Sequence, residues 1–114
     1  MMTRPKDVRF YVTEDGHVTV EEWLSAIEDQ RARTAIDARI ARLRLGLVGH
    51  VRELGEGVHE LKIGVGQGYR VYFGNVSNVV VLLLCGGIKR TQKGDIKRAK
   101  ELWNDYQQRS KVKR

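Results

Sequence analysis

The residues best suited to chemistry lie on two short segments of alternating polarity that a glycine-rich turn joins. The first segment carries Glu60 and Lys62, and the second carries Arg70 and Tyr72. Because side chains alternate between the faces of a strand, each pair lies opposite the apolar face of its own segment. Antiparallel pairing aligns the two apolar faces in either of two registers, which set Glu60 opposite Tyr72 or opposite Arg70. Both registers predict an acid, two cations and a phenol on one exposed patch.

This set of side chains fits the cleavage of a phosphodiester. Attack by the 2′-hydroxyl of RNA requires a base, cations on the developing phosphorane and an acid for the leaving 5′-oxygen. Arg70 suits the phosphate because its guanidinium is bidentate, Glu60 could be the base, and Tyr72 could stack on a nucleobase. On alternation alone, a solvated ion pair across the strands explains these residues at least as well, because such pairs are common and nearly neutral in energy.

More polar residues follow the apolar run 79–85 and its Gly86-Gly87 end. Lys89 and Arg90 come directly after it, and Thr91 and Gln92 stand where a last helix begins. The free N–H groups of a helix start favour an anion. We therefore expect Lys89 to join the catalytic group. The residues expected to contact RNA are Arg90, Gln92 and Lys93, together with Tyr72.

The charge of the chain is uneven. The 114 residues carry a net charge of +7, and from Ile88 onward ten Lys and Arg face three acids. Such a skew predicts a polyanionic partner or an acidic protein, although a basic surface also serves solubility alone.

Several classes of protein are disfavoured. One cysteine cannot form an internal disulfide, the first residues lack a signal-peptide pattern, and the longest apolar run, 79–85, is too short to span a bilayer. We therefore expect a cytoplasmic protein without membrane contact. The three histidines lack metal-ligand spacing, and the 64–68 glycine turn joins two strands rather than a strand and a helix, so we expect neither a metal nor a cofactor.

Hydrophobic periodicity predicts a single α+β domain over 1–114, with helices packed on one face of a small, mainly antiparallel sheet. The expected elements are a strand at 7–13, a helix starting at Thr19, a helix at 32–45, strands at 58–63, 69–73 and 79–85, and a helix at 91–108. Residues 47–57 are expected to be loop, and 109–114 a frayed basic tail.

An ordered series of segments covers the second half of the chain: GVHELKI at 57–63, GYRVYF at 68–73, LLLCGG at 82–87, and then Lys89, Thr91-Gln92, Asp95-Ile96 and Ala99. This series resembles the RelE/HigB superfamily of bacterial toxins, and within it the branch of addiction-module killer proteins. The Glu22-Trp23-Leu24 segment and the Arg42-Leu43…Gly46 segment also stand where that branch has them, so the resemblance covers nearly the whole chain.

The resemblance implies a RelE-like sheet with an N-terminal helical pair and a C-terminal helix. It further implies metal-independent cleavage of mRNA, often on the ribosome, and inhibition by a cognate antitoxin, commonly a small helix-turn-helix protein. Arg70 matches the superfamily's catalytic arginine, Lys62 matches a basic residue of the preceding strand, and Lys89 and Arg90 fall in the basic segment after the long strand.

The chain departs from the pattern at several positions. Ile88 stands where the branch has an acid, Arg90 is an added cation, and Ile96 stands near the position of a catalytic tyrosine in RelE. The C-terminal histidine of some relatives is missing, so the general acid is left open between Glu60, Lys89 and a ribosomal group. ParE toxins share the fold but inhibit DNA gyrase without RNA chemistry, and they are the alternative, as is a degenerate toxin kept for antitoxin binding.

Overall fold

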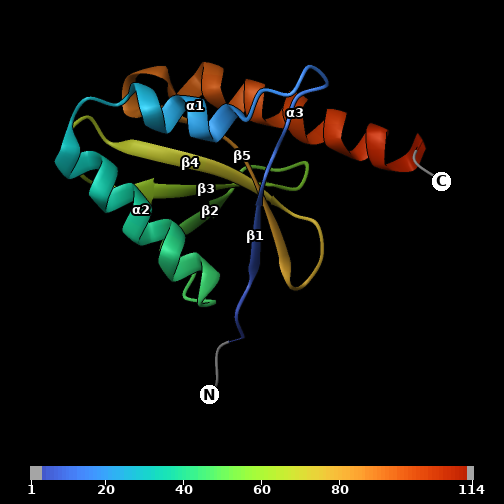
Figure 1. Ribbon diagram of the computed structural model, residues 1–114, viewed down its shortest axis with the longest axis horizontal. Coiled ribbons are helices and arrows are strands. Elements are labelled where there is room, and N and C mark those ends of the chain that lie inside the picture. The colour runs from blue at the N-terminus through green and yellow to red at the C-terminus, as the bar shows by residue number, and fades with distance from the viewer. Residues whose placement is uncertain (1–3, 113–114) are drawn as a thin grey trace.

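The computed structural model describes residues 4–112 (Figure 1). In chain order its elements are β1 (Asp7–Phe10), α1 (Thr19–Ala26), α2 (Gln30–Arg44), β2 (Val51–Glu53), β3 (Val58–Ile63), β4 (Tyr69–Asn75), β5 (Val80–Ile88), a 3-10 turn η1 (Lys89–Thr91) and α3 (Gln92–Val112). The strands form one sheet in the order β1-β5-β4-β3-β2. The β1–β5 pair is parallel and the other pairs are antiparallel. The predicted α+β class, with a helical pair before the sheet and one helix after it, is confirmed.

Helices cover both faces of the sheet, which corrects the expectation of a single covered face. One cluster packs α1 and α2 residues such as Val20 and Ile36 against Leu61 and Leu83. The opposite cluster packs α3, through Ala99 and Trp103, against the other face. The cause is β5, whose apolar run alternates Val81 and Leu83 into the first cluster with Leu82 and Leu84 into the second. A strand that is apolar on both faces needs cover on both.

The two N-terminal helices begin by different means. Helix α1 starts at Thr19 as predicted, but the Thr19 hydroxyl does not cap the helix: it donates a hydrogen bond to the carbonyl of Leu84 and so ties the helix to β5. Helix α2 starts two residues before the predicted Ala32, because the Asp29 carboxylate accepts hydrogen bonds from the Arg31 and Ala32 amides.

The hairpin of β3 and β4 adopts the first of the two predicted registers. Glu60 pairs with Tyr72 and Lys62 with Arg70. The turn between the strands uses positive φ angles at Gly66 and Gly68, a conformation that glycine adopts without strain. This register sets Leu61 opposite Val71, and both side chains are buried in the α1–α2 core.

The expected loop at 47–57 contains the short edge strand β2, which pairs with β3. The basic residues 109–112, expected to be a frayed tail, extend α3 instead. Arg109 bonds to Asp105 and to the carbonyl of Val12, and its guanidinium lies over the Tyr11 ring. Residues 113 and 114 of that expected tail lie outside the described residues. Within residues 4–112, every helix is too short or too polar to cross a lipid bilayer.

Gly74→Ala tests the packing of α3 on β4. An added Cβ at Gly74 would overlap the Trp103 ring, which is held between the helix and the sheet. We expect a loss of about 1–3 kcal/mol in the free energy of unfolding, as for other overpacked cores. Urea unfolding followed by tryptophan fluorescence measures it. The matched control is Gly64→Ala, where an added Cβ meets no atom within 4 Å; equal stability of the two variants would contradict the packing.

Candidate anion-binding cleft

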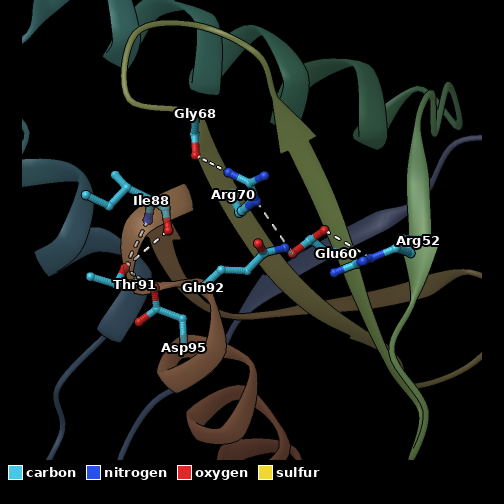
Figure 2. A network of polar contacts seen from close by, with 8 residues as sticks. All are labelled: Arg52, Glu60, Gly68, Arg70, Ile88, Thr91, Gln92 and Asp95. Atoms are coloured by element: carbon cyan, nitrogen blue, oxygen red, sulfur yellow. Dashed lines mark hydrogen bonds and ion pairs between the residues drawn. The ribbon is translucent and has the colours of Figure 1, made fainter.

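A cleft of about 230 Å³ opens over the β3–β4 hairpin, at the N-terminal end of α3. Its lining is almost entirely polar: His50, Arg52, Glu60, Lys62, Arg70 and Gln92. Figure 2 shows the side chains of β2, β3, β4 and α3 that converge there. The cleft is on the face of the sheet that α3 covers, so it begins where the helix leaves the strands open.

The registers of three strands arrange the residues on this face of the sheet in two rows. Arg52, Glu60 and Tyr72 stand opposite one another on β2, β3 and β4. Lys62 stands opposite Arg70 in the next row of the same face. Because residues two apart on a strand share a face, pairing alone brings these side chains together.

Glu60 is the centre of the polar contacts. Its side chain is only 4% exposed, and both of its oxygens have partners. Oε2 accepts a 2.7 Å hydrogen bond from Nε2 of Gln92 and lies 3.6 Å from Nε of Arg70, while Oε1 lies 3.4 Å from Nε of Arg52 (Figure 2). A carboxylate buried in this way needs partners, because an uncompensated buried charge destabilises the fold strongly. The sequence placed Glu60 on an exposed patch, and that expectation is wrong.

Arg70 forms the floor of the cleft and is also buried, with 5% of its side chain exposed. Its Nη1 donates to the carbonyl of Gly68, and its Nε makes no hydrogen bond. Nη2 has no hydrogen bond or ion pair with any described residue. Arg70 is buried because its partner on β5 is Gly87. Any Cβ at Gly87 would overlap the Asp95 carboxylate of α3. The missing side chain lets the first turn of α3 approach the sheet.

Tyr72 lies beneath the cleft rather than in it. The side chain is fully buried against α3, and its hydroxyl has no hydrogen-bond partner. Burial, and secondarily the negative charge of Glu60, raise the pKa of the Tyr72 phenol. The expectation that Tyr72 stacks on a nucleobase is therefore wrong, because no face of its ring reaches the surface.

The segment after β5 is only partly in the site. Gln92 lines the cleft, but its side-chain amide donates a hydrogen bond to Glu60. The amide of Lys89 bonds to the carbonyl of Gln67, which holds Lys89 against the hairpin turn beside Gly68. Arg90 and Lys93 are exposed and do not line the cleft. The structure thus brings Glu60, Lys62, Arg70 and Gln92 together, with Lys89 at one end.

His50 and Arg52 are the cleft residues that the sequence missed. They lie just before and within β2, a strand of three residues in a segment expected to be loop. So short a strand gives almost no alternation to detect. What places Arg52 in the cleft is the pairing of β2 with β3, which sets Arg52 opposite Glu60.

The cleft has an excess of positive charge. Three cations, Arg52, Lys62 and Arg70, accompany one carboxylate that lies beneath them. Guanidinium groups whose geometry is already fixed are effective ligands of phosphate and carboxylate. The arrangement can therefore bind an anion of phosphate size between a fixed arginine and two exposed basic side chains.

No known protein-family profile matches the chain. A protein of Haemophilus influenzae, described as uncharacterized, is 49% identical to it over 85 residues, which make up 75% of this chain and 86% of the relative.

Arg70→Ala tests the buried ion pair. We expect a loss of about 3 kcal/mol in the free energy of unfolding, the low end for a broken buried pair, because Arg52 and Gln92 still hold Glu60. Lys62→Ala, its exposed neighbour across the strands, should change stability by less than about 0.5 kcal/mol. Thermal and urea melts of both variants measure the difference, and a fully stable Arg70→Ala would refute the burial.

Tyr72→Phe tests the unpartnered hydroxyl. Removing a buried group that lacks a partner should leave the protein as stable or more stable. The advantage of the variant should grow above about pH 10, where the unfolded phenol of the wild type ionises and the folded one resists. Tyr11→Phe is the control, because the Tyr11 hydroxyl donates a hydrogen bond to Asp105. Loss of that hydrogen bond should lower the free energy of unfolding by about 1 kcal/mol. The tyrosine prediction fails if Tyr72→Phe is the less stable of the two variants.

Proposed function

We propose that this chain, which belongs to the same family as the Haemophilus influenzae protein, is the toxin of a type II toxin–antitoxin system. We propose further that it acts as a metal-independent mRNA endoribonuclease. The observation that carries the proposal is the cleft, in which a fixed arginine and two exposed cations surround a volume of about 230 Å³. The proposal includes a cytoplasmic location, action on ribosome-associated mRNA, and inhibition by a cognate antitoxin, expected to be a small helix-turn-helix protein.

Electrostatic stabilisation of the reacting phosphate is the main chemical role of the cleft. The pentavalent phosphorane carries more negative charge than the diester, so fixed cations favour it over the ground state. Arg70 is well suited to this role because Gly68 and Glu60 hold two of its nitrogens and leave Nη2 for a ligand. Lys62 and Arg52 add charge from the exposed side, at the entrance to the cleft.

Glu60 takes a different part from the one the sequence suggested. Both of its oxygens are engaged and its side chain is buried. We therefore assign it to the positioning of Arg70 rather than to the abstraction of a proton. Lys89, at the end of the cleft beside Gly68, is left as an additional charge near the phosphate.

A gyrase inhibitor of the ParE type is the second candidate, and one observation favours it. Two groups that the sequence offered for RNA chemistry are inaccessible: Glu60, suggested as the base, and Tyr72, suggested for base stacking, are buried. Ile96, near the position of a tyrosine in RelE, packs against the α3 core cluster. A protein that only binds its target, or a degenerate toxin that only binds its antitoxin, needs no such groups. The basic cleft would then be a docking surface.

Induction of the chain in a growing bacterium separates these functions. An endoribonuclease should stop translation quickly and leave new RNA 5′ ends inside coding regions, whereas a gyrase inhibitor should leave mRNA intact and induce the response to DNA breaks. Co-expression of a helix-turn-helix protein encoded next to the chain should restore growth. Intact mRNA in cells that the chain has stopped from growing would refute the endoribonuclease.

Lys62→Ala is the variant that links the activity to the cleft. Its side chain is exposed and the change should leave the fold intact, yet loss of one charge near the phosphate should lower the cleavage rate about tenfold or more. Lys97→Ala is the control, because Lys97 is an exposed lysine of α3 outside the cleft. Primer extension on mRNA in a translation extract measures both rates, and equal rates would remove the cleft from the reaction.

A further inference from the structure

His50 occupies a position in the cleft that the proposed function has not used. It directly precedes β2, whose Val51 pairs with Leu61. Extending that antiparallel pairing by one residue sets His50 opposite Lys62, and Lys62 in turn stands opposite Arg70. The three side chains therefore form a row parallel to the Arg52–Glu60–Tyr72 row and on the same face of the sheet. The lining of the cleft, which includes all three, agrees with this placement.

The other side chains of the cleft are poorly suited to accept a proton at neutral pH. Arginine and lysine are fully protonated there, and the amide of Gln92 does not titrate. Glu60, the one carboxylate, is buried with both oxygens engaged. An imidazole, in contrast, exists in appreciable amounts in both protonation states near pH 7. His50 is exposed, so its ring can reach a bound substrate.

We propose that His50 is the catalytic base of this cleft, an inference that rests on the proposed RNA cleavage. The neutral imidazole removes the proton of the 2′-hydroxyl as the 2′-oxygen attacks phosphorus. The bond from phosphorus to the 5′-oxygen breaks, and the ammonium of Lys62 donates a proton to that leaving oxygen. The products are a 2′,3′-cyclic phosphate and a 5′-hydroxyl. The proton held by His50 then returns through water to Lys62, which stands beside it in the row.

The charges of the two groups match their roles at neutral pH. A base must start without its proton and an acid must start with one, and a neutral imidazole and an ammonium group are suited to these two roles. Arg70 stays charged throughout and binds the phosphate between them. The cleavage rate should therefore depend on pH through His50, because a protonated imidazole cannot accept the proton of the 2′-hydroxyl.

The experiment measures cleavage of ribosome-bound mRNA by wild-type protein, His50→Gln and His50→Ala between pH 5.5 and 8, at single turnover. We expect His50→Gln to lower the rate roughly a hundredfold, as for loss of a general base, and to remove the fall of the rate toward acid pH. Added imidazole should restore part of the activity of His50→Ala, whose truncated side chain leaves room for it. The cyclic phosphate and the 5′-hydroxyl are identified at the cut ends.

His59→Gln is the matched control. His59 lies on the opposite face of β3, where its ring stacks on that of Phe73 with 5.2 Å between the ring centroids. The His59→Gln variant should therefore keep the wild-type rate and pH profile. A His50→Gln protein that melts like the wild type but retains its rate and its acid decline would overturn the assignment while leaving the endoribonuclease intact. A wild-type protein that cuts no mRNA would overturn the proposed function first, and the assignment with it. Rescue of His50→Ala by imidazole is not expected from a merely structural histidine.

Discussion

The buried carboxylate of Glu60 is the interaction on which the functional face depends. It joins four elements, because its partners come from β2, β4 and α3 while it belongs to β3. Taking a carboxylate out of water is costly, and only a complete set of cationic and amide partners offsets that cost. The same requirement fixes Arg70 at the floor of the cleft and holds Gln92 down over the sheet. One buried charge thus determines both the local packing and the position of Arg70 at the floor of the candidate anion-binding cleft.

The position of α3 depends on places where side chains are absent. Gly74 and Gly87 would each overlap the helix if they carried a Cβ, the first against Trp103 and the second against Asp95. Close contact of the helix with β4 and β5 buries Tyr72 and leaves the cleft open only near the N-terminus of α3. The glycines of β4 and β5 therefore shape the functional site without contributing any functional group to it.

The cleft combines a rigid part with an exposed part. Arg70 is held by Gly68 and Glu60, so little reorganisation is needed when a charged ligand arrives. Lys62, Arg52 and His50 surround it on the exposed strands and can adjust to the ligand. For the proposed RNA cleavage, a fixed arginine with exposed groups around it is a suitable arrangement, because groups that exchange protons must reach both solvent and substrate.

The sequence by itself determined the α+β class, the helical pair, the β3–β4 hairpin and the shared face of Glu60, Lys62 and Arg70, since all of these follow from local periodicity and strand alternation. It left two hairpin registers open, and the structure adopts the one that sets Leu61 opposite Val71. Only the tertiary structure brought α3 over the second face, buried Tyr72, and supplied Arg52 and His50 from an edge strand too short to leave a pattern. Alternation tells which face a side chain takes, whereas whether that face meets water depends on an element that is distant in the sequence.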